Sequence, residues 1–185
     1  MADQLNSFYW KVLVVRCQIG DSSAFEELVT ACQPRLRGFL FKLAGREAVD
    51  DLAQEVWMDV FRDLPRLANS DSFLPWFYRI ARNRAYRRFR SRGQTVESLD
   101  AQNLNVADEP SPADDFTAED AQAVHAALDG LSPEHREVLL LRFMEDMNYD
   151  DIAAVVGCHV GTVKSRLHHA KQALRTILEK THEPR

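Results

Sequence analysis

Apolar residues in the first quarter of the chain recur with the period of an α-helix. Between residues 25 and 43 they stand at helical steps: Phe25, Leu28, Val29, Cys32, Leu36, Phe39, Leu40 and Leu43. This spacing places them on one face of a helix. Asp21 or Ser22 is suited to cap its start, because a short polar side chain accepts hydrogen bonds from the first N–H groups. Pro34 is expected to kink the helix or to divide it in two.

Two more helices are predicted before residue 93. One extends from about Glu47 to Leu64, with an apolar face formed by Val49, Leu52, Val56, Val60 and Leu64. The next extends from Ser72, a suitable cap, to about Arg92, with a core face formed by Phe73, Trp76, Phe77 and Ile80. No segment alternates apolar and polar residues convincingly with the period of a strand. The pattern therefore predicts an all-α protein.

The last third of the chain predicts a helix-turn-helix. Residues 132–134, Ser-Pro-Glu, form a helix start, since the hydroxyl caps, the proline fits the first helical position and the acid favours the helix dipole. Two helices follow, from Tyr149 to Val156 and from about Val160 to Glu179, with Gly157 between them. Short helices joined at a glycine are typical of this motif.

Charge divides the chain more sharply than its net value of −5 suggests. Seven arginines without an acid among them lie within residues 79–92, whereas residues 93–135 contain no lysine or arginine and many carboxylates. A Pro-Ser-Pro segment in that acidic stretch breaks any helix. We therefore predict two small helical domains, residues 10–93 and 121–183, joined by a flexible acidic linker over residues 94–120.

No pattern of a catalytic or metal site is found. The three cysteines, Cys17, Cys32 and Cys158, form no CxxC pair and are interpreted as small buried apolar residues. The histidines show no HExxH spacing, and no glycine-rich phosphate loop or nucleophile motif occurs. No apolar run is long enough to span a bilayer, and the first residues lack the pattern of a signal peptide. We expect a cytoplasmic, non-enzymatic protein without cofactor, metal or membrane insertion.

The outer face of the last helix suits a DNA groove. Ile152, Val156, Val163 and Leu167 are expected to pack the two helices of the motif together. The residues left on or near the outer surface are Thr162, Lys164, Ser165, Arg166 and His169. Such side chains can reach base edges and phosphates in a major groove. The alternative is a basic face that is only solvated.

The arginine-rich helix suits a nucleic-acid strand. At about 100° per residue, Arg79, Arg82, Tyr86 and Arg90 fall on one stripe beside the apolar face. The cations would meet phosphates, and aromatic rings at the border would stack on the unpaired bases of an opened duplex. The alternative is that the aromatic residues belong to the core and the arginines only make the helix soluble.

An acidic row lies on the helix predicted over residues 47–64. Asp51, Glu55 and Asp59 stand at four-residue steps, where like charges weaken a helix by roughly a few tenths of a kcal/mol per pair. Arg62 is placed to relieve only Asp59. A basic protein surface that covers the row would explain it, because DNA would be repelled. A solvated face is the alternative.

Taken in this order, the segments resemble the sigma-70 superfamily of RNA polymerase subunits, and within it the small extracytoplasmic-function (ECF) group, which keeps regions two and four. Residues 20–28, GDSSAFEEL, look like the opening of region two, and residues 50–56, DDLAQEV, like its polymerase-binding helix. Residues 76–83, WFYRIARN, are similar to the segment that recognises and melts the minus-ten element. Residues 131–138, LSPEHREV, with residues 161–167, GTVKSRL, look like region four, which reads the minus-thirty-five element.

The resemblance implies a role for each surface. The residues expected to dock on the β′ clamp helices of core RNA polymerase are Asp50, Asp51, Leu52, Gln54, Glu55 and Asp59. Those expected to hold the melted minus-ten strand are Phe73, Trp76, Arg79, Arg82, Asn83, Tyr86, Arg87 and Arg90. Those expected to read the minus-thirty-five DNA are His159, Gly161, Thr162, Lys164, Ser165, Arg166 and His169. The family also implies a contact of region four with the β flap, an anti-sigma partner, and a linker that follows the RNA exit path or is a plain tether.

Two other functions fit part of this pattern. A helix-turn-helix regulator that acts without polymerase would bind promoter DNA tightly as the isolated chain. A pure interaction module, such as a sigma mimic that sequesters a regulator, would give no promoter-specific transcription even with polymerase present. We expect a sigma factor, because several independent motifs occur in the order of that family.

Overall fold

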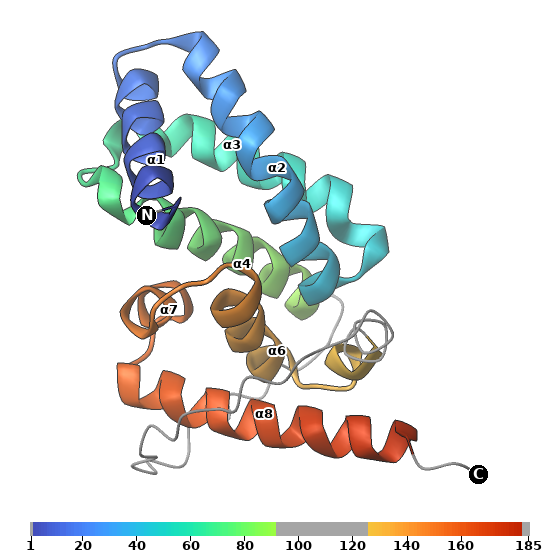
Figure 1. The fold of residues 1–185 in the computed structure, drawn as a ribbon. Helices are drawn as coiled ribbons and strands as arrows, with labels where there is room; N and C mark the ends of the chain where they lie inside the picture. Colours follow the sequence, from blue (N-terminus) through green and yellow to red (C-terminus); the bar gives the residue numbers. More distant parts are fainter. Residues whose placement is uncertain (1, 92–125, 183–185) are drawn as a thin grey trace. The chain divides into compact units, whose positions relative to one another are not determined.

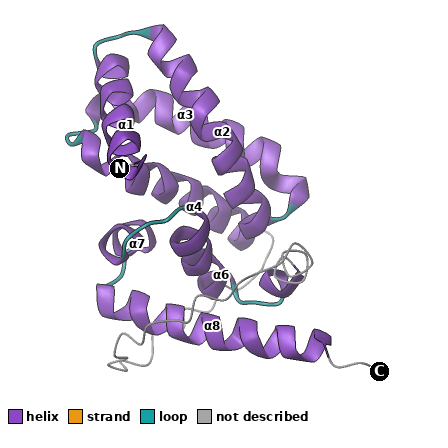
Figure 2. Cartoon of the chain, in the orientation of Figure 1, coloured by secondary structure: helices purple, strands orange, loops and turns teal. Residues whose placement is uncertain are grey.

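The computed structural model describes residues 2–91 and 126–182 (Figure 1). The predicted linker, residues 94–120, lies outside the described residues. The described residues divide into two compact units, an N-terminal unit, residues 2–91, and a C-terminal unit drawn from residues 126–182. Both units are built from helices, and the part of the chain that the structure describes contains no strand (Figure 2). The predicted all-α fold is confirmed.

Four α-helices build the N-terminal unit. They are α1 (Ala2–Gln18), α2 (Ser22–Ala44), α3 (Val49–Asp63) and α4 (Phe73–Ser91). Short 3-10 turns at Arg46–Ala48, Leu64–Arg66 and Ser70–Ser72 connect α2 to α3 and α3 to α4. α2 packs against α1, α3 and α4, and α3 packs against α4 (Figure 1). This arrangement brings together α3 and α4, the two helices of this unit that carry predicted binding residues.

The core of this unit is formed by one face of each helix. Leu28 and Leu36 of α2 are fully buried, and so are Phe77 and Tyr78 of α4. The rings of Phe39 and Tyr78 meet edge to face with 5.2 Å between their centroids, a favourable geometry for aromatic pairs. Most of the predicted apolar faces are buried, but Trp76 and Ile80 of the predicted α4 face are only half-buried.

α2 runs unbroken through Pro34. A proline inside a helix removes one backbone donor and crowds the preceding turn. Pro34 itself is exposed, however, while Cys32 and Leu36 on either side of it are buried. Packing of this long apolar face holds the helix together, because tertiary contacts routinely override local propensity. The predicted division of the helix at Pro34 does not occur.

The first helix, α1, was missed by the sequence pattern. Trp10, Leu13 and Val14 are buried, but exposed apolar residues also lie along this helix: Phe8, Val12, Val15 and Ile19. Because apolar residues occur on more than one face, the helical period is blurred. The domain predicted to begin at residue 10 thus begins inside a helix.

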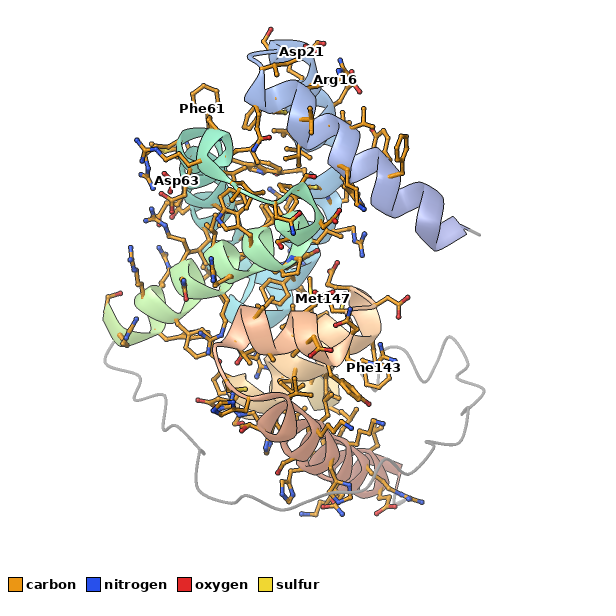
Figure 3. The ribbon with its side chains drawn as sticks, turned by 90° about the vertical axis from the view of Figure 1, so that its left-hand side faces the viewer. Arg16, Asp21, Phe61, Asp63, Phe143 and Met147 are labelled. Carbon is orange, nitrogen blue, oxygen red and sulfur yellow. The ribbon has the colours of Figure 1, made fainter. Side chains whose placement is uncertain are left out.

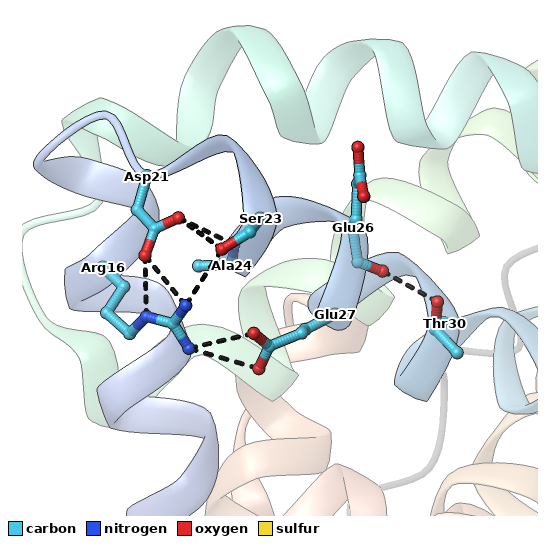
Figure 4. A network of polar contacts seen from close by, with 7 residues as sticks. All are labelled: Arg16, Asp21, Ser23, Ala24, Glu26, Glu27 and Thr30. Carbon is cyan, nitrogen blue, oxygen red and sulfur yellow. Dashed lines mark hydrogen bonds and ion pairs between the residues drawn. The ribbon is translucent and has the colours of Figure 1, made fainter.

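A polar network fixes the corner between α1 and α2 (Figure 4). Asp21 caps α2 by accepting a hydrogen bond from the backbone N–H of Ala24, at 3.2 Å. The Arg16 guanidinium donates to Asp21 at 2.8 Å, to Glu27 at 3.1 Å and to the Ser23 hydroxyl at 3.2 Å. Hydrogen bonds from Ser23, from the Ala24 N–H and from Arg16 lower the pKa of Asp21 to about 2. The predicted capping role of Asp21 is confirmed.

The C-terminal unit contains the predicted helix-turn-helix. Its helices are α6 (Pro133–Leu139), which continues as a π-helical turn over Leu140–Met144, α7 (Tyr149–Val156) and α8 (Val160–His182). α6 packs against α8. The Ser132 hydroxyl caps α6, and the Asn148 side chain caps α7. Gly157 adopts φ of 74° between α7 and α8, a left-handed conformation that favours glycine.

The cysteines are less uniform than predicted. Cys32 is buried, but Cys17 and Cys158 are only half-buried, so the interpretation of all three as core residues is corrected. Burial is the main cause that raises the pKa of the Cys17 thiol. Among the described helices, none is long and apolar enough to cross a membrane.

Candidate protein and nucleic-acid interfaces

The arginines of α4 fall into two groups with different surroundings. Arg84 and Arg88 turn toward the carboxylates of α3. Arg79, Arg87 and Arg90 are exposed and make no ion pair with any described residue. With Asn83, which is also exposed, these three lie at steps of four and three along one stripe of the helix. We call residues 79, 83, 87 and 90 the α4 stripe.

A hollow lies beside the α4 stripe, between α3 and α4. It encloses about 330 Å³ and is lined from α4 by Ile80, Asn83, Arg84 and Arg87, and from α3 by Asp59, Arg62 and Asp63. Arg62 donates to Asp59 and to Asp63, both at 2.8 Å. The hollow therefore presents hydrogen-bond donors and acceptors together, with Arg87 as its unpaired cation among the described residues.

The aromatic residues predicted to meet DNA are placed differently from one another. Phe73 and Tyr86 are buried, so their rings belong to the core, and their contact with bases stays a prediction. Trp76 is half-buried, with its ring centroid 6.1 Å from that of Phe73. The Arg82 guanidinium lies 4.3 Å from the centre of the Tyr86 ring, a cation–π distance. Of the predicted aromatic set, Trp76 remains partly accessible.

The acidic row of α3 is neutralised within the unit. Arg84 contacts Glu55 at 2.9 Å and Asp59 at 2.5 Å, and Arg88 stands 3.8 Å from Asp51. Arg62 pairs with Asp59 as predicted, and α4 places two further arginines along the row. Exposure falls along the row, from 69% of the side chain at Asp51 to 45% at Glu55 and 11% at Asp59.

The predicted docking residues are therefore not equally accessible. Asp50, Asp51 and Gln54 are exposed, and Asp50 pairs with Arg37. Leu52 and Asp59 are buried, and their contact with a partner protein stays a prediction. Leu52 faces inward because it lies on the apolar stripe of α3, next to Val56.

The structure adds two apolar residues that the sequence interpretation missed. Met58 and Phe61 are 65% and 69% exposed, and follow Gln54 along α3 at steps of four and three. The Phe61 ring packs edge-on against Phe25 of α2, with 5.2 Å between centroids, and its outer face is free (Figure 3). The signal that could have revealed these two residues in the sequence is the presence of large apolar side chains on the polar face of a helix. Together with Asp51 and Gln54 they form what we call the α3 face.

The predicted base-reading residues of α8 also divide. His159 and Gly161 are exposed, and Thr162, Lys164 and His169 are half-buried. The ammonium of Lys164 stands 5.5 Å from the centre of the Tyr149 ring, and the Arg142 guanidinium stands 5.6 Å from it. These contacts hold one cation of α8 close to α7.

Ser165 and Arg166 are buried, and their predicted surface position is corrected. Arg166 follows the buried Val163 by one turn, so the helical period carries it toward the inner face. Burial, His169 and Arg166 together lower the pKa of His135 on α6. Within the described residues, no cluster of three or more metal-ligating side chains occurs.

The sequence matches two family profiles. Residues 28–95 match Sigma-70 region 2, and residues 121–174 match Sigma-70, region 4. The chain is 33% identical over 178 residues to the RNA polymerase sigma-H factor of Pseudomonas aeruginosa, covering 90% of this chain and 92% of that protein. It is 29% identical over 189 residues to the ECF RNA polymerase sigma-E factor of Haemophilus influenzae, covering 97% and 98%.

Solved structures show the same fold. The sigma factor RpoE of Bartonella quintana, in complex with the anti-sigma factor NepR, superimposes with a TM-score of 0.62 at 29% identity, over 84% of this chain and 96% of that chain. CnrH, in complex with the cytosolic domain of CnrY, gives a TM-score of 0.69 at 22% identity, over 93% and 98%.

Two separate parts of the sequence match sigma-70 regions, region 2 first and region 4 after it, and these matches define the class of protein. The chain belongs to the sigma-70 family, as an RNA polymerase sigma factor that directs promoter-specific initiation of transcription. Within that family it falls in the ECF group. A helix-turn-helix regulator that acts without polymerase is set aside, since both regions match sigma factors over most of the chain.

Proposed function

We propose that each unit of this sigma factor binds through the surfaces described above. A region-two domain, residues 10–93, docks core RNA polymerase and holds the melted minus-ten strand. A region-four domain, residues 121–183, reads the minus-thirty-five element. The observation that carries the proposal is the α4 stripe, where three arginines without a described ion pair lie on the helix that packs against α3.

The α3 face is the proposed docking surface for the β′ clamp helices. Asp51, Gln54 and Glu55 offer acceptors to a basic partner, and Met58 and Phe61 offer exposed apolar area beside them. Interfaces of this kind combine a central apolar anchor with a polar rim. Phe61 is the proposed apolar anchor, because its ring already packs against the ring of Phe25.

The α4 stripe is the proposed site for the opened minus-ten strand. Arg79, Arg87 and Arg90 would contact successive phosphates, and Asn83 can donate to and accept from a base edge. The half-buried ring of Trp76, one turn before Arg79, would stack on an unpaired base. Phe73 and Tyr86 support this surface from the core.

The proposed minus-thirty-five surface consists of His159, Gly161, Thr162, Lys164 and His169 on α8. These residues sit at and just after the start of a helix that follows a turn, as in other helix-turn-helix proteins. Ser165 and Arg166 are left out because they are buried. The exposed Phe143, which lies beside Lys171, and the exposed Met144 suit the contact with the β flap.

Regulation by an anti-sigma factor is also proposed, on the precedent of the RpoE–NepR complex. We further propose that the chain acts in the cytoplasm without catalytic activity, cofactor or metal of its own. The acidic residues of 94–120 would follow the RNA exit path or serve as a tether.

One experiment tests the function as a whole. The purified chain is added to core RNA polymerase, and the transcripts made from genomic DNA are sequenced. New, discrete start sites that share upstream elements are expected. The absence of both new start sites and polymerase binding would overturn the proposal, and polymerase binding without new start sites would indicate a pure interaction module.

A further inference from the structure

One arginine joins the two proposed surfaces of the N-terminal unit. Arg84 approaches Asp59 with two nitrogens, Nε at 2.6 Å and Nη2 at 2.5 Å, and reaches Glu55 with Nη1 at 2.9 Å. The Asp59 side chain is 11% exposed, whereas that of Glu55 is 45% exposed. Asp59 therefore anchors one edge of the guanidinium in a sheltered place, and Glu55 holds the other edge at the surface.

Arg84 also borders the α4 stripe. Arg84 lines the hollow between α3 and α4 together with Asn83 and Arg87, which belong to the stripe. Arg84 is thus the residue of α4 that both contacts the acidic row by ion pairs and borders the proposed strand-binding site. Arg88 is held more loosely, with 3.8 Å to Asp51, and does not line the hollow.

We propose that Arg84 couples polymerase docking to strand binding: a basic partner that takes Glu55 frees the Nη1 edge of Arg84, which then contacts a phosphate of the opened strand. The inference rests on the proposed function, because it uses its two surfaces. Arg84 is a strand-binding residue that changes partner, and its anchor on Asp59 keeps it in place during the change.

Competition for a charged partner gives the physical reason. While Glu55 and Asp59 both accept from Arg84, the three nitrogens of its guanidinium are engaged with carboxylates, and none is left to donate to a phosphate. When a cation of the polymerase takes Glu55, the Nη1 edge of Arg84 loses its acceptor and becomes available to a phosphate. The chain without polymerase would therefore bind single strands more weakly than its exposed arginines allow.

The coupling can be tested without polymerase by a substitution that removes the negative charge of Glu55. Binding of a fluorescent oligodeoxythymidine 12-mer to the full chain is measured by anisotropy at several salt concentrations. Glu55→Gln should tighten binding three- to tenfold and steepen the slope of log K against log salt by about 0.7, the value for one added phosphate contact on a single strand. Glu47→Gln, which removes one exposed charge in the turn before α3, is the matched control and should leave the slope unchanged.

A double-mutant cycle assigns the gain to Arg84. In the Arg84→Gln background, Glu55→Gln should give no steeper slope than Glu47→Gln gives. An equal gain with and without Arg84, or an equal slope change for Glu55→Gln and Glu47→Gln, overturns the inference. Should Arg84→Gln fail to fold by circular dichroism, the comparison of Glu55→Gln with Glu47→Gln decides alone.

The same assay separates this inference from the proposed function. If Arg79→Gln and Arg87→Gln do not weaken oligonucleotide binding, the strand-binding site itself is misplaced. If they do weaken it and Glu55→Gln still gives no gain, the site stands and the coupling through Arg84 is overturned.

Discussion

Asp51 and Asp59 are two turns apart on one helix, yet their surroundings differ. Asp59 is nearly covered and is held by Arg62 from its own helix and by Arg84 from α4. Asp51 is open to solvent, with its nearest cation, Arg88, at 3.8 Å. A buried carboxylate that is paired twice belongs to the structure of the unit, whereas an exposed one is available to a partner.

Stability measurements should separate the two carboxylates. Asp59→Ala should lower the free energy of unfolding of the N-terminal unit by about 2 kcal/mol, because it removes the buried acceptor of two guanidinium nitrogens of Arg84 and leaves Arg84 with Glu55 alone. Asp51→Ala, the matched control, should cost less than about 1 kcal/mol, as exposed ion pairs do. Urea denaturation followed by circular dichroism measures both. Equal costs would show that Asp59 is not the structural member of the row.

The cap of α2 should make stability depend on acid pH. The pKa of Asp21 is lowered from 3.8 to about 2 in the folded chain, so its ionised form stabilises the fold above pH 3.8, and this contribution is lost as the pH falls toward 2. Asp21→Asn cannot ionise. The difference in Tm between the natural chain and this variant should therefore shrink between pH 5 and pH 2.

A second variant checks the cause of that shift. The hydrogen bond from the Ser23 hydroxyl is the largest of the causes that lower the pKa of Asp21. Ser23→Ala should move the loss of stability to higher pH. A Tm difference that stays constant from pH 5 to pH 2 in both comparisons would contradict the assignment.

At the scale of whole helices, α3 combines two tasks on different faces. Its inner face packs Leu52, Val56 and Val60 into the core. Its outer face leaves Met58 and Phe61 exposed beside the acceptors of Asp51 and Gln54. Exposed apolar residues gathered on one face mark protein interaction sites more often than single ones do. The proposal of a docking surface thus rests on the whole outer face.

Removing the proposed anchor should weaken docking. Phe61→Ser should reduce the affinity for core polymerase about 10- to 100-fold, since burying a phenylalanine side chain contributes roughly 1.5–3 kcal/mol. Phe8→Ser, which changes an equally exposed phenylalanine on α1, is the matched control and should leave the affinity unchanged. Competition with a labelled sigma factor for core enzyme measures both. Similar losses for the two variants would place the docking surface elsewhere.

For the molecule as a whole, the distribution of charge matters more than its sum of −5. Acids that pair with α4 do not repel a partner as bare charges would, and the exposed arginines of α4 that have no ion pair with a described residue are gathered on the α4 stripe. Such a chain presents a local basic surface while its overall charge limits unspecific binding to nucleic acid. Recognition of DNA should therefore depend on a few named arginines.

The salt dependence of DNA binding tests whether these arginines contact phosphates. In the complex with core polymerase, Arg79→Gln and Arg87→Gln should each lower the slope of log K against log salt for single-stranded promoter DNA by about 0.7. Arg175→Gln, which removes an exposed cation paired with Glu179 on α8, should leave that slope unchanged. A loss of affinity without a change of slope would mean that these arginines do not contact phosphates.

Much of this protein is determined by its sequence alone, because the signals are local. Apolar residues at helical spacing predicted α2, α3, α4 and α8, and short polar residues before helices predicted the caps at Asp21 and Ser132. The motifs in residues 50–56, 76–83 and 161–167 were sufficient to indicate the family. Helical period, capping and motif order each depend on residues close together in the chain.

The tertiary structure decided which side chains reach a partner, because exposure and ion pairing depend on contacts far apart in the sequence. Arg84 lies 29 residues after Glu55, and nothing in either segment alone reveals that they meet. The same holds for the burial of Tyr86 and Arg166, and for the support that Phe25 gives to Phe61. Local pattern thus defined the helices and the family, whereas the packing of one helix on another selected the surfaces.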